Sequence, residues 1–324
     1  MLIFMYKLTV AVLTYNRAHY LKKMLDSIQN QSYKDFYVII YDNCSNDNTT
    51  KTVKPYLSDS RFSYYRHPVS IGRNNINYAI ENCETEYLLI SHDDDIMLPD
   101  MIKEELYILE NNKNVSLVST EINYIDINDS IIKYSVIKSI FNYYTDIIKS
   151  RDYINIFINI GYIINCPTVM FRMSILNINN LKFRSDIGGA CDIYLWLELN
   201  QLNYNFYFIR KALYNYRLHN DQDSKNTLFM IPLLKKPIYY LLIKFNYNLH
   251  TIFSWLHFVN NRIICLIKGQ ENKIIAYRSI RPFIYLNNFY DLIFIIRIYY
   301  LLYVPNYIKK YLLHLKKCLK RLYL

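Results

Sequence analysis

Three consecutive aspartates, Asp93, Asp94 and Asp95, have the clearest capacity for chemistry in this sequence. They follow the apolar run at residues 87–91, whose composition predicts a buried strand. Adjacent carboxylates repel one another unless a cation or several hydrogen-bond donors neutralise them, and Mg²⁺ or Mn²⁺ suits carboxylates together with substrate phosphates. The pattern therefore predicts a divalent metal site. The alternative is an acidic turn that caps the helix expected to begin at Pro99.

Two further polar clusters follow predicted strands. Asp42, Ser45 and Asp47 come after the strand expected at residues 37–41, and residues 14–17 come after the strand expected at residues 8–14. The carboxylates and hydroxyl of the first cluster suit hydrogen bonds to a nucleotide base or ribose. An Asx turn that caps the following helix is the alternative, and both roles can coexist at the same residues.

Strands and helices alternate along the chain and must position these clusters. Hydrophobic periodicity predicts strands at residues 8–14, 37–41, 62–65, 87–91, 115–120, 168–171 and 206–216. Between them it predicts helices around residues 21–28, 49–57, 74–82, 99 onward and 192–200, while residues 123–162 fit either a helix or a hairpin. Such alternation favours an α/β, Rossmann-like fold with a mostly parallel central sheet flanked by helices. Ligands bind at the carboxyl ends of such strands, so the three clusters are expected in one crevice.

The composition of the 324-residue chain is that of a folded protein with a full hydrophobic core. Hydrophobic residues make up 52% of it and charged residues 20%, which excludes a disordered tail and a small disulfide-stapled protein. The six cysteines include no C-x-x-C pair, so we expect free thiols in a reducing compartment and no zinc finger. The N-terminal apolar stretch lacks a preceding basic segment, and we expect no signal peptide.

The charge is distributed unevenly along the chain. Residues 230–324 carry 15 lysines and arginines against two acids, whereas residues 1–229 hold 23 basic and 25 acidic residues. This change of character predicts a first domain at residues 1–228 and a helical, basic region at residues 229–324. Its last part, residues 306–324, has the pattern of an interfacial helix on an anionic membrane, and packing on the first domain with solvated lysines is equally open. We expect neither a nucleic-acid partner nor a transmembrane span, which needs ~20 mostly apolar residues.

Five ordered segments within residues 7–225 resemble the family 2 glycosyltransferases of the GT-A fold. They are T-V-A-V-L-T-Y-N-R at 9–17, V-I-I-Y-D-N-C-S-N-D-N-T at 38–49, Gly72 followed by Asn77, L-L-I-S-H-D-D-D-I-M-L-P at 88–99, and Y-R-L-H at 216–219. Five motifs in family-like order are more specific than any one of them. The resemblance implies a GT-A domain with a nucleotide-sugar half at about residues 1–120 and an acceptor half at about residues 121–228.

The resemblance also implies a site for a nucleotide-sugar donor, in the first place a UDP- or dTDP-sugar. Thr14 matches a position that contacts the nucleotide, and Asp42 with Asn43 matches the pair that reads the base, although Asn43 stands where an aspartate is commoner. The residues assigned to the nucleotide sugar are Thr14, Tyr15, Asn16, Arg17, Asp42, Asn43, Ser45, Gly72, Arg73, Asn77 and Asp93. The residues assigned to Mn²⁺ or Mg²⁺ are Asp94, Asp95 and His219, whereas His92 is expected to be structural.

Asp192 falls on the position of the catalytic base of inverting family members. Residues 188–197 are similar to the family stretch E-D-x-D-L-W-L, with Cys191 in place of the glutamate and Tyr194 in place of the second aspartate. In inverting transfer this carboxylate deprotonates the acceptor hydroxyl as the hydroxyl attacks the anomeric carbon. A helix N-cap is the alternative role for Asp192.

The resulting hypothesis is a metal-dependent, inverting glycosyltransferase that adds single sugars to a glycan or lipid-linked glycan during capsule, lipopolysaccharide or other surface polysaccharide synthesis. The Q-x-x-R-W motif of processive synthases is absent from the sequence. We expect a cytoplasmic protein, peripheral on the inner membrane if the basic region binds lipid. The alternatives are a catalytically degenerate membrane-surface scaffold, suggested by the altered Cys191 and Tyr194, and a nucleotidyltransferase, whose Gly-rich phosphate loop is missing.

Overall fold

The computed structural model describes residues 6–134, 146–159, 162–220 and 222, together with residues 237–238, 241–248, 251–252, 255–256 and 259. The chain divides into two compact units, residues 1–225 and residues 226–324, and each is described by itself.

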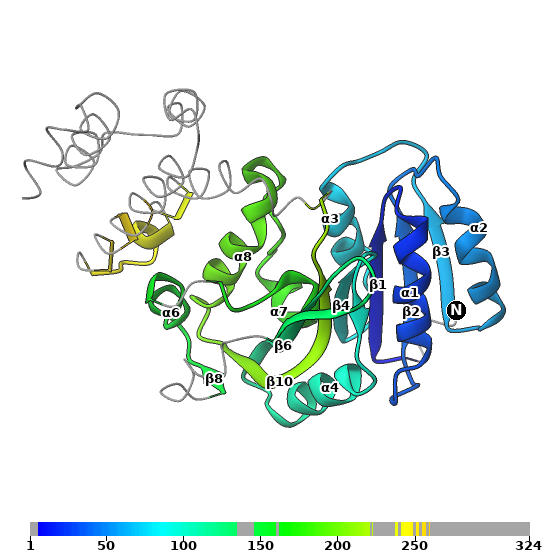
Figure 1. Ribbon diagram of the computed structural model, residues 1–324. Coiled ribbons are helices and arrows are strands. Elements are labelled where there is room, and N and C mark those ends of the chain that lie inside the picture. Colours follow the sequence, from blue (N-terminus) through cyan, green and yellow to red (C-terminus); the bar gives the residue numbers. More distant parts are fainter. Residues whose placement is uncertain are drawn as a thin grey trace, which may run out of the picture. The chain divides into compact units, whose positions relative to one another are not determined.

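The first unit alternates between strands and helices, as expected from the sequence (Figure 1). Its strands are β1 (Leu8–Thr14), β2 (Tyr37–Asp42), β3 (Phe62–Arg66), β4 (Tyr87–His92), β5 (Ile96–Met97), β6 (Val115–Ile125), β7 (Ile131–Tyr134), β8 (Ile147–Ile148), β9 (Val169–Arg172) and β10 (Asn205–Arg217). Its α-helices are α1 (Ala18–Gln29), α2 (Thr49–Val53), α3 (Asn74–Glu81), α4 (Met101–Asn111), α6 (Tyr153–Asn159), α7 (Met173–Ile178) and α8 (Cys191–Leu199). Short 3-10 helices lie at Lys54–Ser58, Cys166–Thr168 and Ser185–Ala190.

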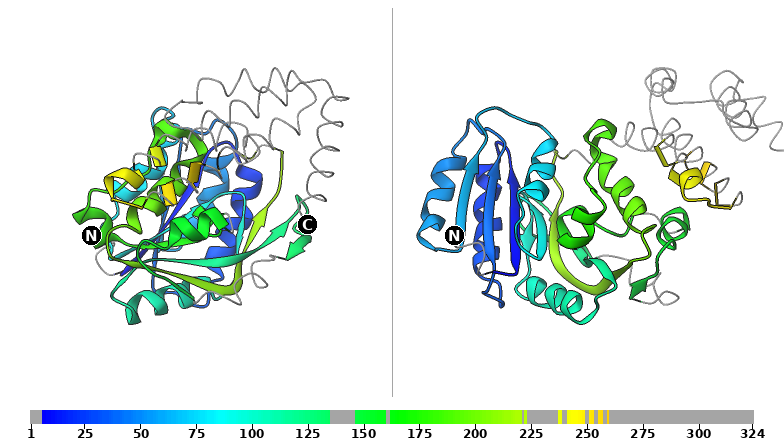
Figure 2. Two further views of the ribbon diagram at one scale, coloured as in Figure 1. Left: turned by 90° about the vertical axis from the view of Figure 1, so that its left-hand side faces the viewer. Right: turned by 180° about the vertical axis from the view of Figure 1, so that it is seen from behind.

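The strands form one sheet in the order β3-β2-β1-β4-β9-β6-β10-β5, with β7 paired to β6 and β8 paired to β10. β1 pairs in parallel with β2 and β4, β2 pairs in parallel with β3, and β6 pairs in parallel with β10. β9 is antiparallel to both of its neighbours, and β5 is antiparallel to β10. Helices flank the sheet in both views of Figure 2. The predicted α/β class with a mostly parallel sheet is confirmed.

The central strand and the first helix show why the sequence folds this way. Every residue of β1 except Leu13 is buried, as expected for a strand with neighbours on both edges and helices on both faces. In α1 the four apolar residues that recur at helical spacing, Leu21, Met24, Leu25 and Ile28, are all completely buried. The alternation of these elements places β1, β2 and β4 side by side with their carboxyl ends at one edge.

Strand β10 bends strongly as it crosses the sheet (Figure 2). Its pairing with β6 shifts register between Asn205 and Phe206, between Ile209 and Ala212, and again between Ala212 and Tyr214. Such irregularities bend a strand and increase its twist. The end of β10 thereby comes next to the aspartates that follow β4, because the backbone N–H of Arg217 donates to the Asp95 carboxylate.

Two expected boundaries differ from the structure. The helix expected to begin at Pro99 begins at Met101, after Asp100. The strand expected at residues 115–120 continues to Ile125 and turns back into β7, so part of the region left between helix and hairpin is a hairpin. A tight turn at residues 126–130 closes it, in which the Asp126 carboxylate accepts from the backbone N–H groups of Asn128 and Ser130.

Glu105 is a completely buried acid on α4. Neither of its carboxylate oxygens has a hydrogen-bond partner in the part of the chain that the structure describes. Burial raises the pKa of Glu105 well above its usual value of 4.5. Because the folded chain then holds a proton that the unfolded chain releases, this residue lowers stability progressively as the pH rises above about 4.5.

We expect Glu105→Met to raise the free energy of unfolding at pH 8 by about 1–3 kcal/mol, since it removes a buried polar group without partners. The gain should shrink at pH 5, where the glutamate is protonated in the folded chain. Urea unfolding at the two pH values measures both effects, with Glu110→Gln, at a half-exposed acid of the same helix, as the control. An equal or lower stability of Glu105→Met at pH 8 would contradict the prediction.

The described residues of the second unit are mostly helical, and seven apolar residues among them are buried: Ile238, Leu241, Leu242, Ile252, Trp255, Leu256 and Val259. Among the residues that the structure describes, no helix is long and apolar enough to cross a membrane. The interfacial helix predicted at residues 306–324 lies outside the described residues. The boundary near residue 228 and the membrane role of the basic region stay predictions.

Candidate functional site

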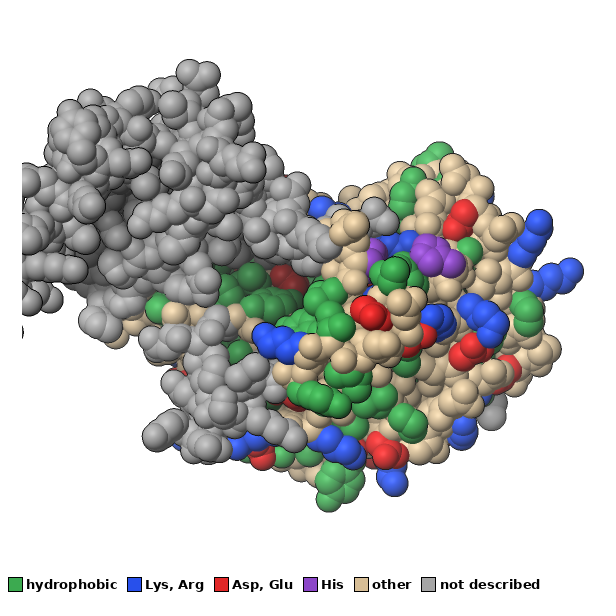
Figure 3. Space-filling model, viewed as in Figure 1, with side chains coloured by type: hydrophobic (Ala, Val, Ile, Leu, Met, Phe, Trp, Pro, Cys, Tyr) green, Lys and Arg blue, Asp and Glu red, His purple; other side chains and the backbone are tan. Residues whose placement is uncertain are grey.

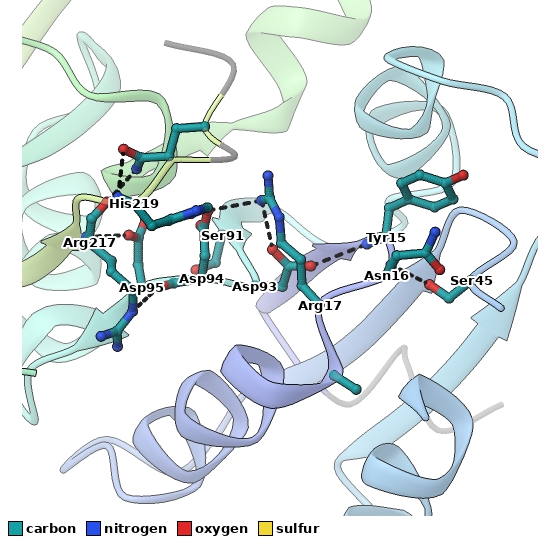
Figure 4. Close-up of polar contacts among 12 residues, drawn as sticks. Tyr15, Asn16, Arg17, Ser45, Ser91, Asp93, Asp94, Asp95, Arg217 and His219 are labelled. Carbon is teal, nitrogen blue, oxygen red and sulfur yellow. Dashed lines mark hydrogen bonds and ion pairs between the residues drawn. The ribbon is translucent and has the colours of Figure 1, made fainter. Parts of the chain in front are cut away.

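The three polar clusters lie together at the carboxyl ends of β1, β2 and β4 (Figure 4). The backbone N–H of Tyr15 donates to Asp93 Oδ2 at 3.1 Å, and the backbone N–H of Asn16 donates to Ser45 Oγ at 2.9 Å. The backbone N–H of Asn43 donates to the Thr14 carbonyl at 3.0 Å. The turn after β1 is therefore tied to the turns after both neighbouring strands.

Arg17 contacts the aspartate turn, which is formed by Asp93, Asp94 and Asp95, through two of its carboxylates (Figure 4). Its Nη1 lies 3.2 Å from Asp93 Oδ1 and 2.9 Å from Asp94 Oδ2. His219 Nε2 lies 2.8 Å from the same Asp94 oxygen. A guanidinium and an imidazole thus converge on Asp94, as hydrogen-bond donors do on a carboxylate that stays ionised.

The three aspartates are buried and differ in their proton affinities. Burial, together with the charge of Asp94, raises the pKa of Asp93 to about 6. Burial and the charge of Asp94 also raise the pKa of Asp95 well above its usual value. Burial alone would raise the pKa of Asp94, but the hydrogen bond with His219 and the charges of His92 and Arg17 together lower it. Asp94 is therefore the aspartate best held as an anion.

The aspartate turn has the donor atoms of a divalent metal site. One atom each from His92, Asp94 and Asp95 lies within 4.8 Å of the others. The Oδ2 atom of Asp95 is buried and has no hydrogen-bond partner among the described residues, so a cation bound there would satisfy it. Two carboxylates and one imidazole suit Mn²⁺ or Mg²⁺, and the residues fit such an ion. The sequence predicts a structural role for His92, whereas the structure places His92 in this cluster with Asp94 and Asp95.

Asp42 and Asn43 use their side chains within the protein. Asp42 is completely buried, and its carboxylate accepts from the Ser45 backbone N–H at 2.8 Å and from the Tyr64 hydroxyl at 2.5 Å. Asn43 accepts from the Ile71 backbone N–H at 2.8 Å and donates to the Gly72 carbonyl at 3.2 Å. These bonds are those of a turn that holds the loop at residues 70–72 against the end of β2. The reading of a base by Asp42 and Asn43 stays a prediction.

Ser45 and Asp47 also stabilise local structure. The Asp47 carboxylate accepts from the backbone N–H of Ala18, the first residue of α1, and from the backbone N–H of Thr49, the first residue of α2. Ser45 Oγ is the acceptor for Asn16 N–H. The capping role that the sequence left open is thus present, and it fixes the turns that surround the aspartates.

The loop before α3 and the helix itself surround a contact with the segment that leads to α8. Gly72 has a φ of +58°, which a residue without a side chain adopts at least cost. Asn77 is buried, and its amide donates to the Phe183 carbonyl and accepts from the Phe183 backbone N–H, both at 2.8 Å. These two hydrogen bonds attach α3 to the segment that leads to α8. The expected contact of Asn77 with the nucleotide sugar stays a prediction.

Asp192 is buried in the first turn of α8 rather than before the helix. Its Oδ2 accepts a hydrogen bond from the Tyr162 hydroxyl, and its Oδ1 accepts from the Ile193 backbone N–H at 2.6 Å. Burial raises the pKa of Asp192 to about 6, and the Tyr162 hydrogen bond offsets part of this rise. A carboxyl group with this pKa can gain and lose a proton near neutral pH, and the catalytic role of Asp192 stays a prediction.

The first turn of α8 lies within electrostatic reach of the loop before α3. Burial and the charge of Asp192 raise the pKa of Cys191 to about 12, and the charge of Arg73 offsets part of this rise. Arg73, which directly precedes α3, therefore lies near Cys191 at the start of α8. Among the described residues on the face seen in Figure 3, acidic, basic and histidine side chains are interspersed with apolar ones.

Comparison with known proteins identifies the family. The model of glycosyl transferase family 2 matches residues 9–177. The chain belongs to glycosyl transferase family 2. It is 30% identical over 231 residues to the O-antigen biosynthesis glycosyltransferase WbnJ of Escherichia coli. The aligned region covers 69% of this chain and 84% of WbnJ. As a member of this family the chain is a glycosyltransferase, which excludes the nucleotidyltransferase alternative.

Solved structures match the fold at low sequence identity. The Staphylococcus aureus TarS fragment 1–349 in complex with UDP-GlcNAc has a TM-score of 0.63 and 18% identity over 86% of this chain and 80% of that one. The mannosyltransferase PcManGT of Pyrobaculum calidifontis, in complex with GDP-Man and Mn²⁺, has a TM-score of 0.57 and 16% identity over 86% of this chain and 74% of that one. These likenesses establish the GT-A fold of this glycosyltransferase.

Proposed function

We propose that this glycosyltransferase moves a sugar from a nucleotide-sugar donor to a glycan acceptor, with a divalent metal and with inversion at the anomeric carbon. The observation that carries the proposal is the presence of two separate buried acidic groups in the first unit. One is the aspartate turn at the strand ends, with Arg17 and His219 on Asp94. The other is Asp192 on α8, whose raised pKa suits a group that gains and loses a proton near neutral pH.

The donor would bind at the ends of β1, β2 and β4. Asp94 and Asp95, with His92, would hold the divalent ion, which when bound neutralises the charge of the departing diphosphate. Asp93 accepts from the Tyr15 backbone N–H through Oδ2, and it is the aspartate assigned to the ribose. Arg17 and Arg73 are the cations that would orient the donor's phosphates, because guanidinium groups match phosphate geometry.

Asp192 would act as the base toward the acceptor hydroxyl. Above pH 6 it is mostly a carboxylate, so it can accept the proton that the hydroxyl loses as it attacks the sugar. The Tyr162 hydroxyl donates to the same carboxylate and fixes its orientation. The first turn of α8 also favours a negative charge, because the partial positive end of the helix dipole lies there.

The printed names of two relatives support the proposed acceptor class. WbnJ is named for O-antigen biosynthesis, and TarS is named a poly(ribitol-phosphate) β-N-acetylglucosaminyltransferase. We therefore assign this enzyme to the synthesis of a surface glycan, with a glycan or lipid-linked glycan as acceptor. The basic region at residues 229–324 would bring it to an anionic membrane surface.

The test is a screen of nucleotide sugars with the full chain. Binding and slow hydrolysis of UDP-, dTDP- and GDP-sugars are measured with and without Mn²⁺, by calorimetry and by release of the nucleoside diphosphate. The proposal predicts that one base class binds, and that binding strengthens with Mn²⁺. Failure of every donor to bind in the presence of metal would contradict the enzymatic proposal and favour the scaffold alternative.

A further inference from the structure

Arg217, at the end of β10, is a completely buried cation that contacts the aspartate turn. Its backbone N–H donates to Asp95 Oδ1 at 2.8 Å, and its Nε donates to the Asp94 carbonyl at 2.7 Å (Figure 4). One residue thus holds both the backbone of the turn and one carboxylate oxygen. The other Asp95 oxygen, Oδ2, is left without a hydrogen-bond donor among the described residues.

The far side of the same guanidinium is anchored in the turn between β6 and β7. Its Nη1 donates to the Asp126 carbonyl at 2.7 Å and lies 2.6 Å from Asp129 Oδ1. The guanidinium carbon lies 4.9 Å from the ring centre of Tyr20 on α1, within the range of a cation–π contact. Asp129 in turn pairs with Lys23, also on α1, at 2.5 Å. Arg217 therefore links the aspartate turn to a hairpin and a helix that are distant in sequence.

The arrangement is more elaborate than a stabilising ion pair requires. Burying a guanidinium is costly, and Arg217 Nη2 has no hydrogen-bond partner within the described ranges. A well-packed apolar side chain would serve stability equally well in many such places. What an apolar side chain cannot do is hold the Asp94 carbonyl through one nitrogen while another is fixed to the carbonyl and carboxylate of the hairpin turn.

We propose that Arg217 is a positioning residue of the donor site, held in place by Asp129, which aims the Asp95 carboxylate at the divalent ion. The inference rests on the proposed metal-dependent function and adds a role for two residues that touch neither metal nor donor. Arg217 fixes one Asp95 oxygen through its backbone, so the remaining oxygen has a defined direction. Outer residues that orient ligands in this way typically change metal affinity about 10- to 100-fold when they are replaced.

The test measures Mn²⁺ affinity rather than turnover. Free Mn²⁺ is followed by electron paramagnetic resonance during titration of the full chain, in the presence of UDP, dTDP or GDP in turn. We expect Arg217→Lys to raise the Kd for Mn²⁺ by at least about 10-fold, because an ammonium cannot bond the Asp94 and Asp126 carbonyls together. Asp129→Asn should also raise the Kd for Mn²⁺, because it removes the carboxylate that pairs with Arg217. Affinity for the nucleoside diphosphate without metal should stay at the wild-type value in both variants.

The matched control is Glu104→Gln, which breaks the exposed ion pair between Glu104 and Lys211, a residue of the same strand β10. This variant should bind Mn²⁺ as the wild type does. If Arg217→Lys fails to fold, Asp129→Asn decides the matter, because Asp129 is partly exposed. A lower Tm with unchanged Mn²⁺ affinity in the folded variants would overturn the inference and leave Arg217 a purely structural residue. Absence of Mn²⁺ binding by the wild type would overturn the metal-dependent function itself, and this inference with it.

Discussion

Replacement of Asp192 by asparagine should lower kcat about 10²- to 10⁴-fold while donor affinity stays at the wild-type value. Asparagine has the shape of aspartate and can accept the Tyr162 hydrogen bond, but it cannot take a proton from the acceptor hydroxyl. Donor hydrolysis gives kcat before the acceptor is known, because water then takes the place of the hydroxyl. Calorimetry with the nucleotide sugar measures the affinity.

The control for this variant is Asp186→Asn, six residues earlier in the same segment. Asp186 is exposed and pairs with Arg184, so its replacement should leave kcat unchanged. Retention of most of the wild-type kcat by Asp192→Asn would remove Asp192 from the reaction and restore a purely local role in the first turn of α8.

The pH dependence of the wild type provides a second readout of Asp192. Since the pKa of Asp192 is raised to about 6, kcat/KM should fall as the pH drops through that value. The Asp192→Asn variant should lack this decrease.

The stability of the wild type should change with pH in the opposite sense to kcat/KM, because the pKa of Asp192 in the folded chain lies above the unfolded value of 3.8. The contribution of Asp192 to stability is therefore lost as the pH rises through about 6, so Asp192→Asn should be the more stable protein at pH 8 and lose this advantage near pH 4.

Replacement of Asp94 by alanine should abolish the dependence of donor binding on Mn²⁺. Asp94 is the aspartate on which Arg17 and His219 converge, and its pKa is held below its usual value. Without it, the metal loses the ligand best held as an anion. We expect the Kd for Mn²⁺ to rise by more than about 100-fold, beyond the effect of replacing an outer residue. Calorimetric titration of the nucleoside diphosphate with and without Mn²⁺ measures the loss.

Asp100→Asn is the matched control for Asp94→Ala. Asp100 follows the same turn, but its carboxylate accepts from the Ser32 hydroxyl, away from the aspartates. It should bind metal as the wild type does. If Asp94→Ala kept Mn²⁺-dependent binding, the metal would have to be assigned to Asp95 and His92 without Asp94.

The sequence alone determined most elements of the catalytic domain. Strand β1 was predicted with its observed bounds, and the apolar face of α1 contains the four residues that are buried. These elements were predictable because hydrophobic periodicity is a local property, and each strand or helix buries the face that its own residues make apolar. The ordered motifs also pointed to the family, and the family model confirms it. Where the pattern was weakest, at residues 123–162, the β6–β7 hairpin came only from the structure.

The tertiary structure decided which partners within the protein the side chains of these motifs have. Asp42, Asn43 and Asn77 carry the motif, yet their polar atoms bond to the hydroxyl of Tyr64 and to the backbone at Ser45, Ile71, Gly72 and Phe183. His92 instead joins Asp94 and Asp95.

Arg217 contacts Asp95 of the aspartate turn although the two residues are 122 positions apart in the sequence. Asp129 contacts Arg217 from the turn between β6 and β7. The sequence determined the strands and the order of the polar clusters, because both depend on neighbouring residues. Only the folded chain decided how each carboxylate is oriented and neutralised, because that depends on partners brought close by the pairing of β4, β6 and β10.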